Sequence, residues 1–320
     1  MANVLVTGGA GFIASHIATA LVKRGDRVRI LDNLCAGFLK NIDHIRDDVE
    51  FIEGDVADES VAATAMKGIE LVFHQAALAS VPLSIERPLD TNHACVTGTL
   101  NILNQAAKAG VKRVVYAASS SAYGDQPFSA KRESDLPQVL SPYAAAKLAG
   151  ELYCQAYYHS FGLETVGLRY FNVFGPRQDP ASPYSAVIPL FVTAILGGQP
   201  PVVYGDGGQS RDFVFVGNVV QGNLLAGEAK DAAGKIFNMA EGRQTSLLQL
   251  LNILADLLGE EIKPDFQPAR AGDVRESLAD ISQARSILGY EPETDLVTGL
   301  KQTIEYYKEI ALKKLADAKS

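Results

Sequence analysis

The sequence is poor in cysteine, and its three cysteines are scattered. Cys35, Cys95 and Cys154 are odd in number, widely spaced and form no CxxC pair, so they fit neither a disulfide framework nor a zinc site. We predict idle thiols in a reducing cytosol and no metal centre. No apolar run reaches the roughly 18 residues of a membrane span, and the glycine turn comes too early for the apolar region of a signal peptide. A cytoplasmic protein is therefore predicted.

Basic residues are also in deficit. Lysine and arginine number 29 against 37 acidic residues, which gives a net charge of −8 and argues against general affinity for nucleic acid or anionic membranes. An anionic ligand would have to be held by particular arginines. With 47% hydrophobic and 21% charged residues, the composition is typical of a soluble globular protein. A length of 320 residues favours two lobes or one enlarged α/β domain.

Strand-like and helix-like segments alternate through the first half of the chain. Strands are expected at 4–6, 27–31, 49–52, 70–74, 113–117 and 164–168, and helices at 12–23, 60–66, 91–109 and 142–161. Alternation of this kind indicates βαβ units. It predicts an α/β protein with a doubly wound parallel sheet of the Rossmann type.

The composition changes after about residue 172. Prolines and glycines cluster between residues 175 and 208, and the remaining strand-like runs are short. We predict an NAD-binding Rossmann domain over 1–172. Residues 173–320 would form mainly a smaller C-terminal α/β lobe that binds the substrate, with some segments returning to the first domain. A closing amphipathic helix with a lysine-rich end, which suits the helix dipole, is expected at 297–318.

A glycine-rich turn follows the first strand and opens the first helix. The pattern Gly8-x-x-Gly11-x-x-Ala14 allows a tight turn and a close approach of the backbone to a pyrophosphate at a helix N-terminus. Glycine turns also occur for structural reasons alone, but the strand before and the helix after favour a nucleotide site. Asp32-Asn33 ends the second strand, where a carboxylate can accept hydrogen bonds from the adenosine ribose and would repel a 2′-phosphate. NAD is thus favoured over NADP.

Tyr143 and Lys147 stand four residues apart in a predicted helix, so their side chains share one face. Tyrosine has an unperturbed pKa of about 10, and a neighbouring ammonium or an oxidised nicotinamide favours the phenolate. Ser119, in a serine cluster at a strand end, can hydrogen-bond the reacting hydroxyl or the carbonyl formed from it. A lone YxxxK often arises by chance. Together with the serines and the glycine turn, it predicts Tyr143 as the general base and NAD as the carrier of hydride chemistry.

These motifs, in this order, resemble the extended short-chain dehydrogenases/reductases, and specifically the nucleotide-sugar epimerases and dehydratases. The resemblance runs from the glycine turn to about residue 292. It also rests on residues 74–77, 90–92, 119–125, 168–177, 210–213 and 272–275. One departure is Ala14, where these enzymes usually have a third glycine; we expect only a slight adjustment of helix packing.

The resemblance implies two sets of binding residues. Cofactor contacts are implied for Gly8, Gly11, Phe12, Ile13, Asp32, Asn33, Asp55, Val56, Gln75, Ala76, Ala77, Asn92, Tyr143, Lys147 and Tyr170. Substrate contacts are implied for Ala79, Ser80, Ser119, Ser120, Tyr143, Asn172, Val187, Tyr204, Arg211, Arg270, Asp273 and Ser277. The family alignment brings Asn172, Arg211 and Arg270 to a diphosphate, with Arg177 as a weaker candidate. Arginine suits phosphate because its planar fork makes paired, charge-assisted bonds. Tyr204 would stack on the uracil and Asp273 would reach the ribose.

The residues after Ser119 separate the reactions of the family. Sugar 4,6-dehydratases carry an Asp-Glu pair there to protonate the leaving hydroxyl and remove a C5 proton, whereas this chain has Ser120-Ser121. Dehydration is therefore disfavoured. The resemblance to 4-epimerases implies that Tyr143 takes the proton of the 4′-hydroxyl while NAD takes the C4 hydride. The 4-keto sugar then turns over about its diphosphate linkage, and the hydride returns to the opposite face.

Two positions bear on the size of the sugar. In 4-epimerases a bulky tyrosine closes the hexose pocket, and the alignment places Ser277 there; Ala79 replaces a long lysine of the strictly hexose-specific enzymes. Residues 75–82 and 169–189 most resemble bacterial UDP-N-acetylglucosamine 4-epimerases. The resemblance therefore implies interconversion of UDP-GlcNAc and UDP-GalNAc, and of UDP-glucose and UDP-galactose as well.

Two other functions stay open on the sequence. A UDP-glucuronate 4-epimerase would share Ser119, Tyr143 and Lys147 but would need a cation for the C6 carboxylate, which the sequence does not place. A non-catalytic NAD(H)-sensing protein would keep the fold but commonly lose the tyrosine. Helices 91–109 and 142–161 resemble those that pair into a four-helix bundle in family dimers. A homodimer is therefore expected, although the same helices could instead pack only on their own sheet.

Overall fold

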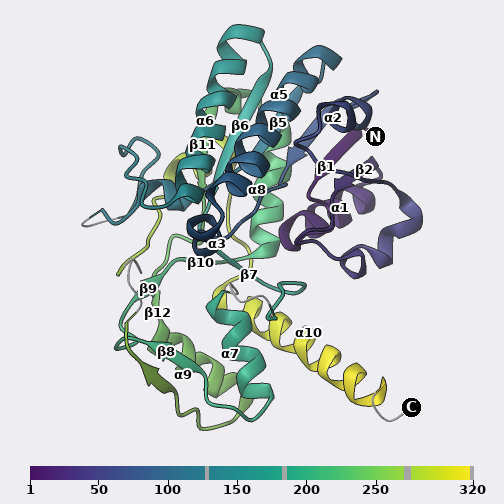
Figure 1. The fold of residues 1–320 in the computed structure, drawn as a ribbon. Helices are drawn as coiled ribbons and strands as arrows, with labels where there is room; N and C mark the ends of the chain where they lie inside the picture. The colour runs from purple at the N-terminus through teal and green to yellow at the C-terminus, as the bar shows by residue number, and fades with distance from the viewer. Residues whose placement is uncertain (127–129, 182–185, 270–274, 318–320) are drawn as a thin grey trace.

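The centre of the computed structural model is a sheet of seven parallel strands (Figure 1). The structure describes residues 1–126, 130–181, 186–269 and 275–317, the last five of these by their backbone alone. In spatial order the strands are β11 (Lys235–Met239), β6 (Glu164–Tyr170), β5 (Arg113–Ser119), β4 (Leu71–His74), β1 (Asn3–Thr7), β2 (Arg27–Asp32) and β3 (Val49–Glu53). This is the predicted doubly wound α/β fold, with one strand, β11, supplied by the chain after residue 172.

The strand order reverses at β1, which pairs with β2 on one side and β4 on the other. In doubly wound sheets, ligands bind outside the carboxyl ends of the strands at this reversal. The glycine turn at residues 8–11 directly follows β1. The fold therefore brings the predicted nucleotide turn to the position where such sheets bind their ligands.

Helices cover both faces of the sheet because alternate strand residues point to opposite sides. Val4 and Val6 share one apolar core with helices α1 and α8, whereas Leu5 belongs to a second core with α2, α5 and α6. The helices are α1 (Phe12–Arg24), α2 (Glu59–Ala65), α5 (Gly98–Ala109), α6 (Pro142–Phe161) and α8 (Val216–Glu228).

Helix α6 has the bounds that the sequence predicts. Pro142 begins it, the Ser141 side chain accepts a hydrogen bond from Ala144 N, and Gly162 ends it in a left-handed conformation, which are strong start and stop signals. The helical run predicted at 91–109 begins earlier, at α4 (Pro88–Asn92), and passes through a π-helical turn (His93–Thr97) into α5. Its proline at the first turn explains the earlier start.

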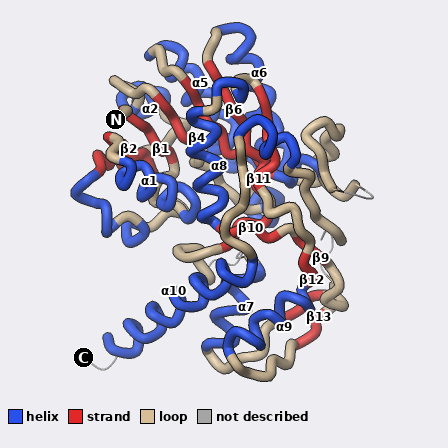
Figure 2. Tube along the Cα trace, turned by 180° about the vertical axis from the view of Figure 1, so that it is seen from behind, coloured by secondary structure: helices blue, strands red, loops and turns tan. Residues whose placement is uncertain are grey.

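A third apolar core builds a smaller lobe beside the carboxyl ends of the strands (Figures 1 and 2). Its helices are α7 (Val187–Leu196), α9 (Leu247–Leu258) and α10 (Leu296–Asp317). Its short strands are β7 (Asn172–Phe174), β8 (Val202–Tyr204), β9 (Ser210–Arg211), β10 (Phe213–Phe215), β12 (Thr245–Ser246) and β13 (Asp265–Gln267). They form three two-stranded pairs: β7 with β10, β9 with β12 and β8 with β13.

Short helical elements complete the connections. These are α3 (Val81–Glu86), η1 (Leu39–Asn41), η2 (Asp43–Asp48), η4 (Ser120–Tyr123), η5 (Lys230–Ala232) and the π-helical η6 (Ala284–Leu288). Across the ranges that the structure describes, no helix has both the length and the apolar character needed to cross a lipid bilayer.

Candidate active site

The glycine turn has the geometry of a pyrophosphate cradle. Gly8 has a φ of +67°, and a Cβ added there would lie 2.8 Å from the Cα of Ala76, so only glycine fits. Gly11 precedes α1, and among the described residues no side chain caps that helix. The N–H groups of the first turn, which Phe12 and Ile13 begin, therefore suit an anion.

Residues predicted for the adenosine end lie at the carboxyl ends of β2 and β3. Asp32 is buried; its Oδ2 accepts a hydrogen bond from Ala10 N at 2.9 Å and its Oδ1 accepts one from Leu34 N at 2.8 Å. Burial raises the pKa of this carboxyl, and the two N–H donors oppose that shift. Asn33 Nδ2 donates to Asp55 Oδ2 at 3.0 Å, next to the buried Val56. These residues fit the ribose and adenine of a dinucleotide.

A second group of predicted cofactor residues surrounds the ends of β4 and β6. Tyr170 Oη lies 3.0 Å from Gln75 Oε1 and 2.9 Å from Asn223 Oδ1 on α8. Ala76 N donates to Thr7 Oγ1 at 3.2 Å, which draws the segment with Ala77 against the glycine turn. Asn92, the last residue of α4, is exposed.

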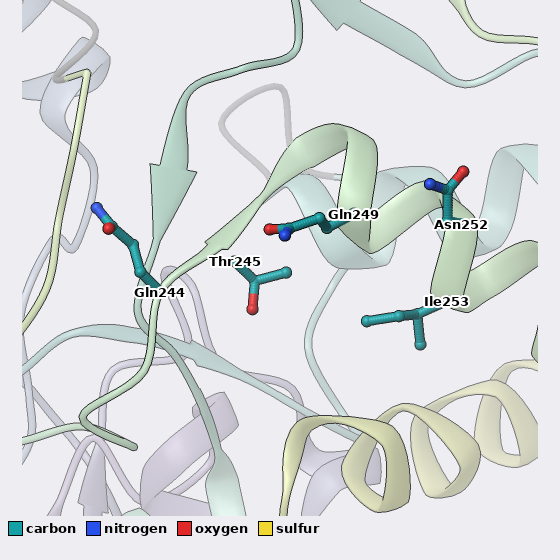
Figure 3. A pocket seen from close by; sticks show the side chains of 5 residues that line it. All are labelled: Gln244, Thr245, Gln249, Asn252 and Ile253. Atoms are coloured by element: carbon teal, nitrogen blue, oxygen red, sulfur yellow. The ribbon is translucent and has the colours of Figure 1, made fainter.

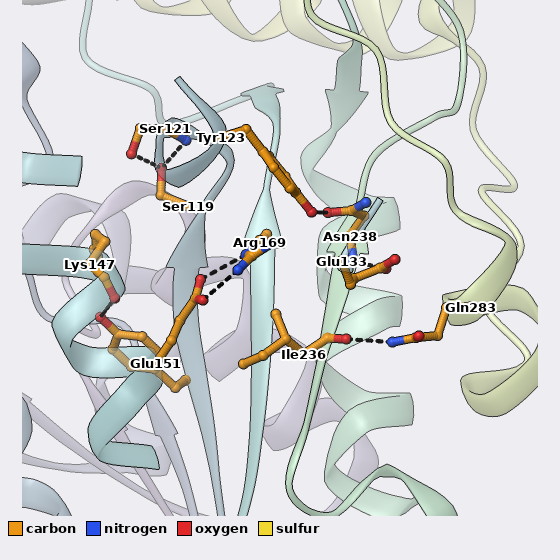
Figure 4. Close-up of polar contacts among 11 residues, drawn as sticks. Ser119, Ser121, Tyr123, Glu133, Lys147, Glu151, Arg169, Ile236, Asn238 and Gln283 are labelled. Carbon is orange, nitrogen blue, oxygen red and sulfur yellow. Dashed lines mark hydrogen bonds and ion pairs between the residues drawn. The ribbon is translucent and has the colours of Figure 1, made fainter. Parts of the chain in front are cut away.

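Ser119 is the last residue of β5, and its oxygen is held by Ser121 (Figure 4). Ser121 donates to Ser119 Oγ from its own Oγ at 2.8 Å and from its backbone N at 3.2 Å. A hydroxyl oxygen has two lone pairs and one hydrogen, so Ser119 is left to donate. Ser121 was not among the predicted site residues, although the run of three serines was the signal for it.

Lys147 is buried on the face of α6 that meets β5. Its Nζ donates to the carbonyl oxygen of Ala117 at 2.8 Å and lies 5.1 Å from the centroid of the Tyr116 ring. Burial lowers the pKa of the ammonium, and the carboxylate of Glu151 is among the groups that oppose this shift. The bond to Ala117 uses one of the three ammonium donors and fixes the head group against the strand that ends at Ser119.

Tyr143 lies one turn before Lys147 on α6. Burial raises the pKa of its phenol above the usual value, and a hydrogen bond with Ser119 lowers it. The structure thus brings Ser119, Tyr143 and Lys147 together as the sequence predicts. Because the buried phenol resists ionisation, a proton leaves it only where hydrogen-bond donors or positive charge face its oxygen.

Three predicted substrate residues lie on neighbouring segments of the smaller lobe. Arg211 on β9 pairs with Thr245 on β12, and its Nη1 donates to Ser210 O at 2.8 Å. On the other side, Ser277 N donates to Ser210 O at 3.1 Å. Asn172 N donates to Asp212 O at 3.1 Å, which brings β7 to the same place. Arg270 and Asp273 lie outside the described residues.

Asp212 holds this part of the lobe together, a role that the sequence analysis missed. Its side chain is fully buried and accepts hydrogen bonds from Glu241 N at 2.9 Å, Gly242 N at 3.1 Å and Ala279 N at 3.1 Å. Burial raises the pKa of the carboxyl to about 7, and the three N–H donors act against that shift. The signal was its place directly after Arg211 in the motif at 210–213.

The other predicted substrate residues occupy the ends of short elements. Ala79 is exposed, Ser80 Oγ caps α3 by accepting from Leu83 N at 3.1 Å, and Ser120 begins η4. Val187 begins α7, and Tyr204 ends β8. A hollow on the lobe, shown in Figure 3, is lined by Gln244, Thr245, Gln249, Asn252 and Ile253. Thr245 pairs with Arg211, so this hollow borders the strand that carries the arginine.

Arg177 joins the cofactor helix to the loop after β7. It has a φ of +68°, which is uncommon for a residue with a side chain. Its Nη1 donates to Ser15 Oγ at 3.3 Å and Thr19 Oγ1 at 3.2 Å, and its Nη2 lies 3.1 Å from His44 Nε2. These contacts direct the guanidinium to α1, whereas the sequence analysis gave Arg177 as a weaker candidate for binding the substrate diphosphate.

Comparison with known families decides where this site belongs. The model of the NAD dependent epimerase/dehydratase family matches residues 4–240. The chain belongs to this family. Its cofactor is therefore NAD, as the sequence predicts, and the glycine turn, Asp32 and the half-buried start of α1 supply a site that fits it.

Relatives in the family carry several substrate names. A UDP-N-acetylglucosamine 4-epimerase from Methanobrevibacter ruminantium M1, solved with UDP-N-acetylmuramic acid, is 39% identical with a TM-score of 0.93, over 97% of this chain and 99% of that one. A UDP-glucose 4-epimerase from Mycolicibacterium smegmatis is 36% identical over 96% of this chain and 98% of its own length. A UDP-glucuronate 4-epimerase from Thermodesulfobacterium geofontis is 34% identical over 96% of both chains. Each name is that of the relative, and the three differ in the sugar.

Proposed function

We propose that the chain is a UDP-sugar 4-epimerase that inverts C4 through a 4-keto intermediate while NAD stays bound. The observation that carries the proposal is the meeting of Ser119 with Tyr143 and Lys147, in a chain that has serines where the dehydratases have their acid pair. Epimerase names among the relatives support the same reaction.

Ser119, Tyr143 and Lys147 would have different roles in proton transfer at the sugar. When bound, NAD accepts the hydride from C4 and later gives it back. Tyr143 takes the proton of the 4′-hydroxyl as general base and returns it after the sugar has turned. Ser119, whose lone pairs are engaged by Ser121, donates its hydrogen to the oxygen at C4. The Lys147 ammonium adds positive charge on the same face of α6 and so favours the phenolate.

The same serines argue against elimination of water. A leaving hydroxyl needs a proton donor, and neither Ser120 nor Ser121 is acidic enough to provide one at neutral pH. Ser121 is in addition engaged with Ser119. The 4-keto sugar therefore persists until it is reduced again, and reduction on either face gives the pair of 4-epimers.

We propose that the smaller lobe, mainly residues 173–320, holds the nucleotide sugar above the NAD-binding residues 1–172. Arg211, Asn172 and Arg270 would face the diphosphate, Tyr204 the uracil and Asp273 the ribose. The net charge of −8 makes particular cations necessary for a dianionic linkage. Strands β7 and β9 and residues 275–277 are hydrogen-bonded to one another through Ser210 and Asp212. This arrangement supports the assignment of Arg211 and Asn172 to the diphosphate.

We propose UDP-GlcNAc and UDP-GalNAc as substrates, together with UDP-glucose and UDP-galactose. Ser277 is small and half-buried beside Ser210, and Ala79 is small and exposed, so neither fills space next to the sugar. Steady-state assays on both pairs test this. Ser277→Tyr is expected to suppress the acetylated pair by about tenfold or more while sparing the other. Absence of turnover of acetylated sugars by the parent would refute the pocket argument.

UDP-glucuronate is the competing substrate because a glucuronate epimerase is among the relatives. It would use the same three residues and would need a cation facing the C6 carboxylate. An assay with UDP-glucuronate separates the two activities. A non-catalytic NAD(H) sensor would bind NAD without turning over any sugar, and the retained tyrosine argues against it.

We also propose a cytoplasmic homodimer formed through the helical run from α4 to α5 and through α6. Large apolar side chains are exposed on both sides of this contact: Leu89 on α4 is 82% exposed and Leu152 on α6 is 58% exposed, and exposed apolar surface favours a protein contact. Light scattering should show a dimer that Leu152→Glu dissociates. Leu136→Glu, at an 83% exposed loop position, is the matched control and should leave the mass unchanged. A monomeric parent would contradict the proposal.

A further inference from the structure

A buried ion pair lies directly below the catalytic face of α6. Arg169 Nε donates to Glu151 Oε1 at 2.9 Å and its Nη2 donates to Glu151 Oε2 at 2.8 Å, with side-chain exposures of only 5% and 4%. Glu151 follows Lys147 by four residues and Tyr143 by eight, so all three lie on one helix face. Arg169 stands on β6 opposite Ala118 of β5, one residue before Ser119.

The same guanidinium also contacts the turn that follows Ser119 (Figure 4). Its Cζ lies 4.6 Å from the centroid of the Tyr123 ring, a cation–π contact. Tyr123 ends η4, and its hydroxyl donates to Asn238 Oδ1 on β11 at 2.7 Å. Arg169 therefore touches the helix that carries the base and the turn that begins at the catalytic serine.

A second ion pair involves the same strand β6 but joins it to β5 instead of α6, and provides a comparison. Arg113 and Glu164 begin β5 and β6, with Nη2 and Oε2 2.6 Å apart. This pair stands at the opposite end of the strands, about 20 Å from Ser119 at the rise of a parallel strand. Buried ion pairs add little net stability over apolar packing. The two pairs differ in burial, since Glu164 is 37% exposed, and in what else they touch.

We propose that Glu151 and Arg169 are positioning residues that hold Tyr143 and Lys147 on α6 against Ser119 on β5. The proposal rests on the proton-transfer roles given above to those three residues. The bidentate geometry fixes α6 along β6 in both distance and rotation. The Glu151 carboxylate also balances the charge of the buried guanidinium, which the Glu133 carboxylate faces as well.

Glu151→Gln tests the proposal, with Glu164→Gln as its matched control. For Glu151→Gln we expect kcat to fall by about tenfold or more, as displaced catalytic groups commonly cause, with little change in KM. The acid limb of the kcat profile should move to lower pH, because the variant removes a negative charge from the face of α6 that carries Tyr143 and Lys147, while the Glu133 carboxylate still faces Arg169. Glu164→Gln should leave kcat and the pH profile as in the parent. The same behaviour in both variants would overturn the proposal.

Two further variants separate charge from geometry and guard against misfolding. Arg169→Lys keeps the charge but loses the bidentate bond to Glu151 and the planar guanidinium over the Tyr123 ring. We therefore expect kcat to fall without a shift of the pH profile. The double variant Glu151→Leu with Arg169→Met removes both charges of the ion pair. If it folds and binds NAD, its kcat should be reduced; a parental kcat would refute the positioning role.

An ultraviolet titration of the Tyr143 phenol makes the test independent of the sugar. The NAD-loaded protein is titrated beside the same protein with Tyr143→Phe, and the difference isolates this tyrosine. The titration should shift to lower pH in Glu151→Gln and not in Glu164→Gln; an unshifted titration would contradict the role of the pair. If the parent turned over no UDP-sugar, the proposed function would fail while this titration still decided the positioning of Tyr143.

Discussion

The two halves of the site are built differently. Ser119 and Lys147 are buried, on a strand of seven residues and a helix of twenty. Asn172 and Arg211 stand on strands of three and two residues, and Ser277 lies beside them on an irregular segment. Long elements packed in a core hold the groups that carry out the reaction. Short segments that tolerate change carry the groups that recognise the sugar.

The largest expected effect comes from the base itself. Tyr143→Phe removes the hydroxyl and leaves the half-buried ring in place, so turnover should fall by about a thousandfold with the fold and bound NAD unchanged. Steady-state rates and the nucleotide content of the purified variant measure both. Loss of NAD together with activity would mean that Tyr143 acts through cofactor binding instead.

The serine cluster should give a graded response. Ser119→Ala removes the hydrogen bond to the oxygen at C4 and should slow turnover by about tenfold to a hundredfold. Ser121→Ala only frees the lone pair of Ser119 that now accepts the Ser121 hydroxyl, so a loss of severalfold is expected. Rates of both variants at saturating substrate make the comparison. Equal losses would show that Ser121 itself faces the sugar.

On the recognition side, Asp212→Asn should act through stability. Replacing one acceptor oxygen by an amide nitrogen loses either the bond from Glu241 N to Oδ1 or the bonds from Gly242 N and Ala279 N to Oδ2, at a cost of about 1–3 kcal/mol. Burial raises the pKa of Asp212 from 3.8 to about 7. The protonated carboxyl therefore contributes stability that is fully present below its unfolded pKa and is lost as pH rises through 7.

Denaturant unfolding at several pH values measures whether the free energy of unfolding falls as the pH rises. The stability of the parent should fall between pH 4 and 7 relative to that of Asp212→Asn, and KM for the UDP-sugar should rise in the variant. Asp206→Asn in the same lobe, at an exposed carboxylate paired with Arg275, is the control and should show neither change. A pH-independent difference between parent and Asp212→Asn would mean that the carboxyl stays ionised throughout.

The smallest effect is expected where the two regions meet. Arg177→Met removes the contacts to Ser15 and Thr19 and should weaken NAD retention and UDP-sugar binding together, each by severalfold. NAD loss during gel filtration and KM measure the two. Arg24→Met, at the other end of α1, should leave both unchanged. If only NAD retention or only KM changed, Arg177 would act on the cofactor site alone or on the substrate site alone.

Much of the catalytic half follows from local sequence signals. The bounds of α6, and with them the shared face of Tyr143 and Lys147, follow from Ser141-Pro142 and Gly162. The glycine turn and Asp32 follow from the order of strand, turn and helix. These signals are local, so a single sequence contains them.

The remainder depends on contacts between distant segments. Asp212 bonds to residues 241, 242 and 279, and Arg169 pairs with Glu151 across two elements. Arg177 turns to α1 because its left-handed backbone aims it there. Periodicity and spacing contain no information on such pairings, and family motifs indicated the segments without the partners.

The most direct test of the central claim follows a deuterium label at C4 of the UDP-sugar. Purified protein, without added NAD, should convert the labelled sugar to its 4-epimer and retain the deuterium at C4, because the hydride leaves and returns within one bound complex. Turnover with loss of the label to solvent, or no turnover of any UDP-sugar by protein that contains NAD, would contradict the account.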